Sequence, residues 1–447
     1  GLSWPLSIVA LGHADFGHKM LKEFSFPDAW VNLNQGSYGA CPIEVQEARR
    51  GYQQLMDANP EAFFRVNMTG DGSSGWADLI DRTRGTLARY LHTNEDNIVL
   101  IENASEGLNA VLRSMAKYLT SGRGILYLDT AYVEVRAILS YLSGKWGNEP
   151  PSPWLQMPLV QVNITPLMPD ITRRAVISQV EAAVRSHEQQ IGLCAFSHIT
   201  STPGLVLPIE ELTAICHKAG ALVLIDGAHA PGNIPLNLTA LKADFYVGNG
   251  HKWLFSPKGS AFLHVKQPVQ KFIYPAVIDG GPGPTPFTRA FVWQGTNDPS
   301  AMIALHDAVQ WRAKRGDGQI MRYMSGVAER GGLSLAAMWG TSLMPPDVEE
   351  RQQMQASMAN VRVPCGCAGE TRCPADPSAL SAQIVREVKT WVPVGEYAGP
   401  GRGLWVRISA SVYNEVGDFE LFGRALLKAL GHSGGRGEVG GEVGVVV

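Results

Sequence analysis

The stretch ALVLIDGAHA, residues 221–230, decides the fold of this chain, together with FYVGNGHK, residues 245–252. Each stretch begins with a short apolar run and ends in polar residues. Such runs, alternating with amphipathic segments, indicate parallel strands of an α/β sheet joined by helices. Ligands bind at the carboxyl ends of the strands in sheets of this kind. We therefore expect Asp226, His229 and Lys252 to lie in one crevice.

The same alternation continues on both sides of this stretch, from about residue 97 to 265. Further strands are predicted at 98–101, 124–128, 193–196 and 260–265, the last returning to the sheet. Polar segments follow several of these strands, at 102–107, 129–132 and 197–201. The sequence therefore predicts a doubly wound α/β unit with polar residues gathered at one edge.

The chain is expected to form two ordered units and a tail. A Gly- and Pro-rich stretch, 280–286, indicates a loop leaving the large unit. Later helices are predicted at 300–313, 318–339 and 419–430, with a strand at 405–409. The predicted division is an N-terminal segment that joins the small unit, 1–54, a large unit, 55–299, a small C-terminal unit, 300–430, and a flexible tail, 431–447.

Composition excludes several classes of protein. Of the 447 residues, 45% are hydrophobic and 18% are charged, which excludes wholesale disorder. The net charge of −3, from 38 basic and 41 acidic residues, lacks the basic excess of a nucleic-acid binder. No apolar run approaches the ~20 residues of a membrane helix, and the apolar stretch 2–11 is too short and lacks a preceding Lys or Arg. We expect a soluble cytoplasmic protein.

The six cysteines are too few for a disulfide scaffold in a chain of this length. Cys365, Cys367 and Cys373 lie in a polar segment without a fourth ligand at zinc-finger spacing. We therefore expect reduced thiols in a loop and no metal site.

Lys252 and Asp226 are the candidate catalytic residues. A lysine at the ligand edge of a sheet can be desolvated, which lowers its pKa and makes it an imine-forming nucleophile; most lysines are instead solvated. Asp226 can hold a pyridinium nitrogen protonated, or it can cap the next helix. His229 can reach the phenolic oxygen of a pyridine ring or the lysine, or serve as a structural loop histidine.

Two other strand ends offer cofactor contacts. Ser105 and the N–H groups around it can cradle a phosphate at a helix N-terminus, although a Ser at this place is more often a helix cap. Tyr132 can stack on an aromatic ring, although a single Tyr more often serves packing.

These motifs carry a resemblance to a known family. Residues 226–229 and 249–254 resemble the core of fold-type I enzymes of the class V aminotransferase group, which depend on pyridoxal 5′-phosphate. The segment NLNQGSYG, residues 32–39, is similar to the opening of isopenicillin N epimerase-like proteins. These include fungal hercynylcysteine sulfoxide lyases and loline-pathway cyclases. The resemblance covers about 16–430 and implies a large domain with a mostly parallel, seven-stranded-type sheet and a smaller α/β C-terminal domain.

The resemblance assigns cofactor contacts to individual residues. It implies that Lys252 forms an internal aldimine with pyridoxal phosphate, that Asp226 pairs with the pyridine nitrogen and that Tyr132 stacks on the ring. It further implies a set of cofactor-binding residues along the same edge, made up of His229, Asn249, Ser105, His251 and, through its backbone, Glu106.

The resemblance also implies a substrate site and a second subunit. Arg407 matches the arginine that grips a substrate carboxylate, a task that suits its bidentate geometry, and Asn34 is assigned to the same site. Without the resemblance, Arg407 would be a surface arginine beside a strand. Thr296 matches a residue that a neighbouring subunit places on the phosphate, which implies a homodimer.

The function predicted from these residues is chemistry at Cα, or an adjacent carbon, of a small amino-acid substrate, through a lysine aldimine and a quinonoid. We favour an epimerase or a decarboxylative or Mannich-type cyclase of specialised metabolism. A C–S lyase of the hercynylcysteine sulfoxide type is the alternative. It is disfavoured because those lyases carry a cysteine in the corresponding region, whereas residues 151–169 of this chain contain none. An aminotransferase is less favoured. A nucleotide-binding Rossmann protein lacks its G-x-G-x-x-G motif here, and an inactive binding protein would be expected to lose Lys252 or Asp226.

Overall fold

The computed structural model describes residues 16–65, 75–119, 122–147, 156–278, 286–365, 373–374 and 376–431. Four features discussed above lie outside them, namely the apolar stretch 2–11, most of the Gly- and Pro-rich loop, Cys367 and the tail beyond residue 431.

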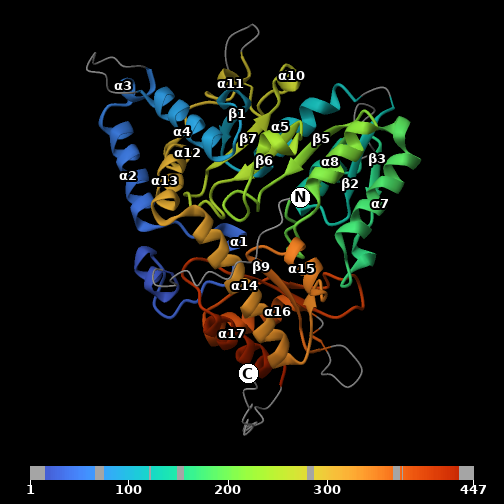
Figure 1. Cartoon of the computed structure of the whole chain (residues 1–447). Coiled ribbons are helices and arrows are strands. Elements are labelled where there is room, and N and C mark those ends of the chain that lie inside the picture. The colour runs from blue at the N-terminus through green and yellow to red at the C-terminus, as the bar shows by residue number, and fades with distance from the viewer. Residues whose placement is uncertain are drawn as a thin grey trace, which may run out of the picture.

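A seven-stranded sheet forms the centre of the large unit (Figure 1), with the strand order β1-β7-β6-β5-β4-β2-β3. Its neighbouring strands pair in parallel, except that β7 runs antiparallel to β1 and β6. The mostly parallel sheet predicted for this unit is therefore confirmed. The strands are β1 (Ile98–Ile101), β2 (Gly124–Leu128), β3 (Leu159–Val162), β4 (Ile191–Ser197), β5 (Leu222–Asp226), β6 (Phe245–Asn249) and β7 (Ala261–Val265).

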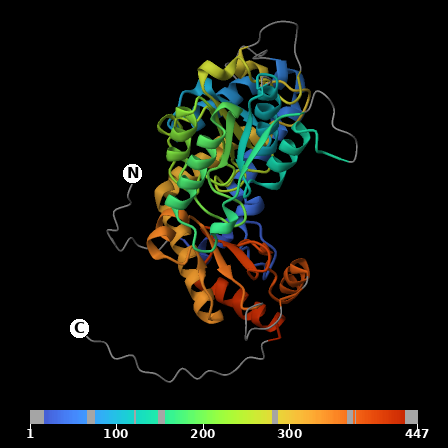
Figure 2. The ribbon, with the colours of Figure 1, turned by 90° about the vertical axis from the view of Figure 1, so that its right-hand side faces the viewer.

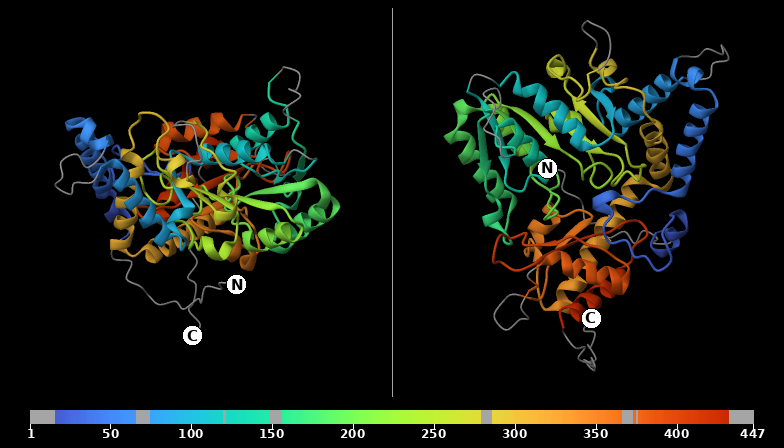
Figure 3. Two further views of the ribbon diagram at one scale, coloured as in Figure 1. Left: turned by 90° about the horizontal axis from the view of Figure 1, so that it is seen from above. Right: turned by 180° about the vertical axis from the view of Figure 1, so that it is seen from behind.

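The sheet is buried on both faces, which explains its continuous apolar runs. In β1, Ile98 and Leu100 belong to one core cluster, whereas Val99 and Ile101 belong to a second cluster on the opposite face. Helices cover both faces (Figure 3). The helices that follow α1 in this part of the chain are α2 (Ile43–Ala58), α3 (Pro60–Arg65), α4 (Trp76–Tyr90), α5 (Ala104–Ala116), α6 (Val133–Leu142), α7 (Arg173–Ser186), α8 (Ile209–Lys218), α9 (Leu238–Leu241), α10 (Gln267–Gln270), α11 (Phe287–Ala290), α12 (Ser300–Ile303) and α13 (Leu305–Arg315), and α1 is Gln35–Tyr38.

A four-stranded antiparallel sheet forms the smaller unit, which lies below the large one in Figure 2. Its strand order is β10 (Val394–Gly395), β11 (Trp405–Ser409), β9 (Met358–Arg362) and β8 (Leu343–Met344). The associated helices are α14 (Asp317–Trp339), α15 (Val348–Met354), α16 (Pro377–Val388) and α17 (Val416–Ala429). No helix in the described part of the chain is long and apolar enough to span a membrane.

The N-terminal segment connects the two units through α1 (Gln35–Tyr38), which lies between them in Figure 3. On one side, the amide of Ser409 in β11 donates to the carbonyl of Leu33 at 2.8 Å. On the other side, Nε2 of Gln35 donates to the carbonyl of Lys252 at 2.8 Å. This segment therefore holds β11 close to the lysine loop.

The hairpin between β10 and β11 makes a second connection. Arg402 donates to the carbonyl of Met168 in the large unit at 2.6 Å. Ala398 is buried in a core cluster shared with that unit, and Tyr397 packs against the same cluster. The hairpin thus carries Tyr397 to the boundary between the units.

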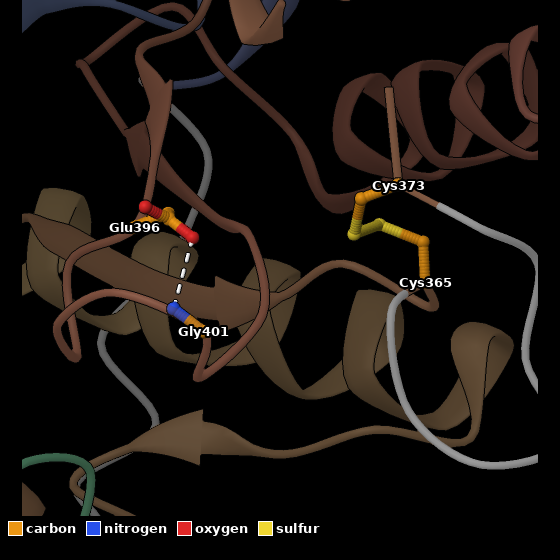
Figure 4. The surroundings of a disulfide bond; sticks show 4 residues. All are labelled: Cys365, Cys373, Glu396 and Gly401. Atoms are coloured by element: carbon orange, nitrogen blue, oxygen red, sulfur yellow. Dashed lines mark hydrogen bonds between the residues drawn. A yellow bond between two sulfur atoms is a disulfide. The ribbon is translucent and has the colours of Figure 1, made fainter. Parts of the chain in front are cut away.

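Cys365 and Cys373 form a disulfide near this hairpin (Figure 4), with their Cα atoms 4.9 Å apart. The expectation of free thiols at these two positions is therefore wrong. The two cysteines are eight positions apart in sequence, and spacing alone does not reveal whether two side chains meet. Within the same hairpin, Glu396 accepts a hydrogen bond from the Gly401 amide at 3.1 Å.

Replacing Gly39 by alanine should destabilise the junction between α1 and the lysine loop. Gly39 has φ = +65°, and a Cβ there would lie 2.0 Å from the carbonyl oxygen of His251. We expect Gly39→Ala to lower the free energy of unfolding by more than about 1 kcal/mol in urea denaturation.

The matched control is Gly51→Ala, within α2, where an added Cβ meets no atom within 4 Å. We expect this change to raise the free energy of unfolding by roughly 0.5–1 kcal/mol, because glycine is unfavourable inside a helix. Equal stability of the two variants would contradict a tight α1 junction.

Candidate active site

Lys252 lies at the carboxyl edge of the large sheet, in the turn between β6 and β7, with 8% of its surface exposed. Its Nζ is 3.1 Å from Nε2 of His229 and 5.9 Å from the centre of the Tyr132 ring. Burial lowers the pKa of Lys252 to about 8, and the charge of Arg407 acts in the same direction, whereas Asp226 opposes the shift. The neutral, nucleophilic amine is therefore accessible near neutral pH.

His229 is neutral and its tautomer follows from its hydrogen bonds. Burial lowers its pKa well below the ordinary value, and the charge of Lys252 adds to the effect. Nε1 of Trp253 points to Nδ1 of His229 at 3.3 Å. Because an indole N–H can only donate, we assign the His229 proton to Nε2, which then donates to Lys252. This arrangement stabilises the uncharged form of the lysine.

Asp226 ends β5 and is buried beside the lysine. Its Oδ1 accepts a hydrogen bond from the Ala228 amide at 3.0 Å. Burial raises the pKa of Asp226, while that hydrogen bond and the charge of Lys252 lower it. Gly227 follows because a Cβ there would lie 2.2 Å from the Tyr246 ring. The carboxyl group is thus held in an environment that a protonated pyridine nitrogen would suit.

Two buried side chains fix the lysine loop by hydrogen bonds to its backbone carbonyl oxygens and to that of Gly232. Gln35, fully buried, bonds the Lys252 carbonyl, and its Oε1 accepts hydrogen bonds from the Ala40 amide and the Tyr413 hydroxyl. Arg312, also fully buried, donates to the carbonyl oxygens of Trp253 at 2.7 Å and of Gly232 at 2.9 Å. Neither residue was predicted to support the site, because their partners lie far away in sequence.

The N-terminus of α5 forms an anion cradle near the lysine. Asn103 caps the helix by accepting the Glu106 amide at 2.9 Å, and Asn249 accepts the Ala104 amide at 2.9 Å. The amide and hydroxyl of Ser105 have no partner among the described residues. The bonds of Asn249 and of the Glu106 amide therefore fix the first turn of α5. The amide and hydroxyl of Ser105 remain available as donors at the N-terminus of this helix, where anions bind.

His251 comes two residues after Asn249, the residue that bonds the start of α5. Its Nδ1 is buried and has no hydrogen-bond partner in the described part of the chain. Burial lowers the pKa of His251 to about 4, and the charge of Lys252 contributes. An unpaired buried nitrogen is costly unless a ligand satisfies it. Ser105 and His251 together fit a phosphate group.

Arg407 is buried in β11, not on the surface, and belongs to the same site. Its guanidinium donates to the Ser201 carbonyl at 2.7 Å, to the Asn34 side-chain oxygen at 2.7 Å and to the Ser37 hydroxyl at 3.1 Å. Burial lowers the pKa of Arg407 to about 10, with Tyr397 and Tyr132 opposing the shift. The predicted proximity of Asn34 and Arg407 is therefore present in the structure.

The Nε of Arg407 is buried without a partner among the described residues, as is the hydroxyl of Tyr397. A bidentate grip on a carboxylate through Nε and Nη2 requires release of Asn34 or Ser37, both of which bond Nη2. Sequence analysis did not identify Tyr397, because nothing in a Gly-rich hairpin indicates which side chain turns inward.

Tyr132 and Thr296 differ in their placement. Tyr132 is at the start of α6, 41% exposed, with its ring facing the lysine. Burial raises its pKa, as does the charge of Glu134. Thr296 lies on an exposed stretch between α11 and α12. Nearby, Gln294 donates to the Glu106 carboxylate at 3.1 Å. The structure of one chain therefore does not bring Thr296 to the lysine.

Comparison with known proteins places this site in a family. Residues 40–365 match the family described as aminotransferase class-V. This match spans more than half of the chain, and the chain belongs to the aminotransferase class-V family. Its cofactor is pyridoxal 5′-phosphate, as the motifs around Asp226 and Lys252 predicted, and the cradle of Ser105 and His251 fits the phosphate group of that molecule.

The chain is also similar to individual proteins over most of its length. It is 26% identical to an L-cysteine desulfhydrase-like protein, lolT1, of Epichloe uncinata, over 92% of this chain and 95% of that protein. It is 28% identical to an isopenicillin N epimerase of Streptomyces clavuligerus, over 89% and 94%. A cysteine desulfurase structure from Thermococcus onnurineus NA1 shares the fold with a TM-score of 0.72, 18% identity, and coverage of 93% and 98%.

The lowered pKa of Lys252 predicts how cofactor capture depends on pH. Only the neutral amine attacks an aldehyde, so the rate of covalent capture by cofactor-free protein should rise up to about pH 8 and then level off. Stopped-flow absorbance after mixing with pyridoxal phosphate measures this rate. A rate that continues to rise towards ~10.4, the ordinary lysine pKa, would indicate a solvated lysine and contradict the buried geometry.

Proposed function

We propose that this enzyme breaks and remakes a bond at Cα, or at an adjacent carbon, of an amino acid, as an epimerase or as a decarboxylative or Mannich-type cyclase. The observation that carries the proposal is the buried Lys252 amine, 3.1 Å from His229 and in the same site as Arg407. When bound, pyridoxal phosphate withdraws electrons from Cα of an attached amino acid and weakens the bonds to that carbon. Lys252 is positioned to serve as the covalent anchor for it.

Proton transfer is assigned to Lys252 and Tyr132. The lowered pKa of Lys252 suits a base that removes a proton from Cα near neutral pH. The raised pKa of Tyr132 keeps its hydroxyl protonated, which suits a donor. His229 donates to the lysine nitrogen in the resting site and so orients it. Epimerisation requires one group that takes a proton and another that returns it, and this pair supplies both.

Substrate orientation is assigned to Arg407 and Asn34. A carboxylate that binds the Arg407 guanidinium would direct the amino group of the substrate towards Lys252. Asn34 and Ser201 hold the guanidinium in place. Asp226 would pair with the pyridine nitrogen, and its burial favours a shared proton there.

A homodimer is part of this proposal. Thr296 is exposed, and the family resemblance assigns it to the phosphate of a neighbouring subunit. An exposed position is compatible with that role, because a residue that contacts the neighbouring subunit's phosphate must lie on the surface of its own subunit.

C–S cleavage is the second candidate, supported by relatives named L-cysteine desulfhydrase. The free cysteines among the described residues, Cys41, Cys194 and Cys216, are all buried. None of these three is exposed to accept a sulfur atom from a substrate. An aminotransferase is not favoured by any specific contact.

The test is to incubate the cofactor-loaded protein in D₂O with a panel of amino acids and to identify the products by mass spectrometry. Deuterium at Cα of the opposite enantiomer, separated by chiral chromatography, indicates epimerisation. Loss of carbon dioxide with formation of a ring indicates decarboxylative closure, and sulfide indicates C–S cleavage. Lys252→Ala should give no product and no borohydride-reducible link to the cofactor. A reducible link in that variant, or amino transfer to a 2-oxo acid by the unchanged protein, would contradict the proposal.

Arg407→Ala should weaken the binding of substrates through their carboxylate. The loss of a hydrogen-bonded charge contact costs on the order of 1.5–3 kcal/mol, or about ten- to a hundredfold in kcat/KM. Arg407→Lys should recover only part of the lost kcat/KM, because a lysine ammonium group cannot reproduce the two parallel hydrogen bonds of a planar guanidinium group. Steady-state kinetics measure the effect, and cofactor absorbance should stay unchanged.

The control is Arg185→Ala, which removes an exposed arginine that forms an ion pair with Glu181 on α7. We expect no change in kcat/KM from it. Equal substrate affinity of the unchanged protein and Arg407→Ala would remove Arg407 from the site.

A further inference from the structure

Glu134 is a carboxylate at the active site to which the chemistry above assigns no task. It is the second residue of α6, two positions after Tyr132. Its Oε2 is buried and has no hydrogen-bond partner in the described residues. Its charge acts on both Lys252 and Asp226, and the Tyr132 ring, two residues before it, faces the Lys252 amine. A first-turn acid gains from the helix dipole, but that gain does not require a buried oxygen without a donor.

Thr130 offers a second unsatisfied oxygen on the same β2–α6 connection. Its hydroxyl is also buried without a partner among the described residues. Buried polar atoms are normally hydrogen-bonded, and a buried carboxylate oxygen is especially costly when it is not. The Glu134 carboxylate can only accept and the Thr130 hydroxyl can accept, so these two buried oxygens, four residues apart, can both be satisfied by a donor group of a bound molecule.

Around Arg407 the imbalance is reversed, because buried donors there lack acceptors. There, Nε–H of Arg407 and the Tyr397 hydroxyl are buried donors without partners among the described residues. The charges of both Glu134 and Arg407 act on the Tyr132 hydroxyl, so both groups lie near it. The site thus contains a negative group, Glu134, and a positive group, Arg407, with Tyr132 near each of them.

We propose that the substrate is a diamino acid, carrying a second, positively charged N–H group in its side chain, and that Glu134 binds this group. This inference rests on the proposed function, in which Arg407 binds the carboxylate. An ammonium or guanidinium group supplies several N–H donors and a charge, which match an ionised carboxylate oxygen and a hydroxyl. A neutral side chain of the same length would leave Oε2 unsatisfied. Glu134 is therefore assigned as a specificity-determining residue.

The test compares cationic amino acids with apolar ones of matched length. Cofactor-loaded protein is titrated with 2,4-diaminobutyrate, ornithine and lysine, and with 2-aminobutyrate, norvaline and norleucine. The change in visible cofactor absorbance gives an apparent Kd for each. We expect at least one cationic amino acid to bind about ten- to a hundredfold more tightly than its apolar counterpart, the range typical of a hydrogen bond to a charged group.

Glu134→Gln should reduce that ratio to about one while leaving the affinity for the apolar amino acids unchanged. Glu134→Asp keeps the charge on a shorter stem, so the preference should move to a cationic amino acid one methylene longer. The matched control is Glu349→Gln, an exposed acid at the same position of α15, which should keep the ratio. Melting temperature and cofactor absorbance report whether each variant is folded.

The proposal is overturned if the unchanged protein shows no preference for cationic side chains, or if Glu134→Gln keeps the preference. If Glu134→Gln does not fold, an unchanged optimum length in Glu134→Asp overturns it. An absorbance that responds to none of the amino acids would instead count against the proposed function as a whole.

Discussion

The burial of one amine, that of Lys252, is the constraint on which the rest of the site depends. Removing an ammonium group from water is costly, so burial lowers the pKa of Lys252 to about 8 and makes its neutral form accessible. The neutral form needs a donor, which His229 supplies, and Trp253 holds that histidine in the required tautomer. The loop itself is fixed through backbone carbonyls by Gln35 and Arg312. These contacts stabilise a nucleophile where solvent would otherwise protonate it.

The two units of the chain meet around this amine and leave polar atoms without partners there. Nδ1 of His251, Oε2 of Glu134, the Tyr397 hydroxyl and Nε of Arg407 are all buried and unpaired within the described chain. Unpaired buried groups reduce the stability of the free protein. A ligand that forms hydrogen bonds with these groups recovers that free energy. The groups that destabilise the free protein therefore favour binding of the matching ligand. A cysteine desulfurase that shares only 18% identity has the same fold, so the fold by itself does not specify these side chains.

Much of the sheet could be predicted from the sequence because its strands are buried on both faces. The strands at 98–101, 124–128 and 405–409 have the predicted bounds, and β4 to β7 are close to theirs. Strand β3 was not predicted. Its residues LVQV form a short edge strand that is half-buried and contains a glutamine, so it lacks the continuous apolar run on which the other predictions depended. The disulfide was also missed, because cysteine spacing does not report how a loop returns.

The sequence by itself determined the fold class, the cofactor and the polar residues that end each strand, because parallel strands bring their carboxyl ends to one edge. Only the tertiary structure decided which distant side chains complete the site. Arg407 meets Asn34 across 373 residues of chain, and Gln35 meets Lys252 across 217. The hairpin that carries Tyr397 reaches the large unit through Arg402. Contacts of this range depend on how the two units pack against each other, and no local pattern of residues encodes that packing.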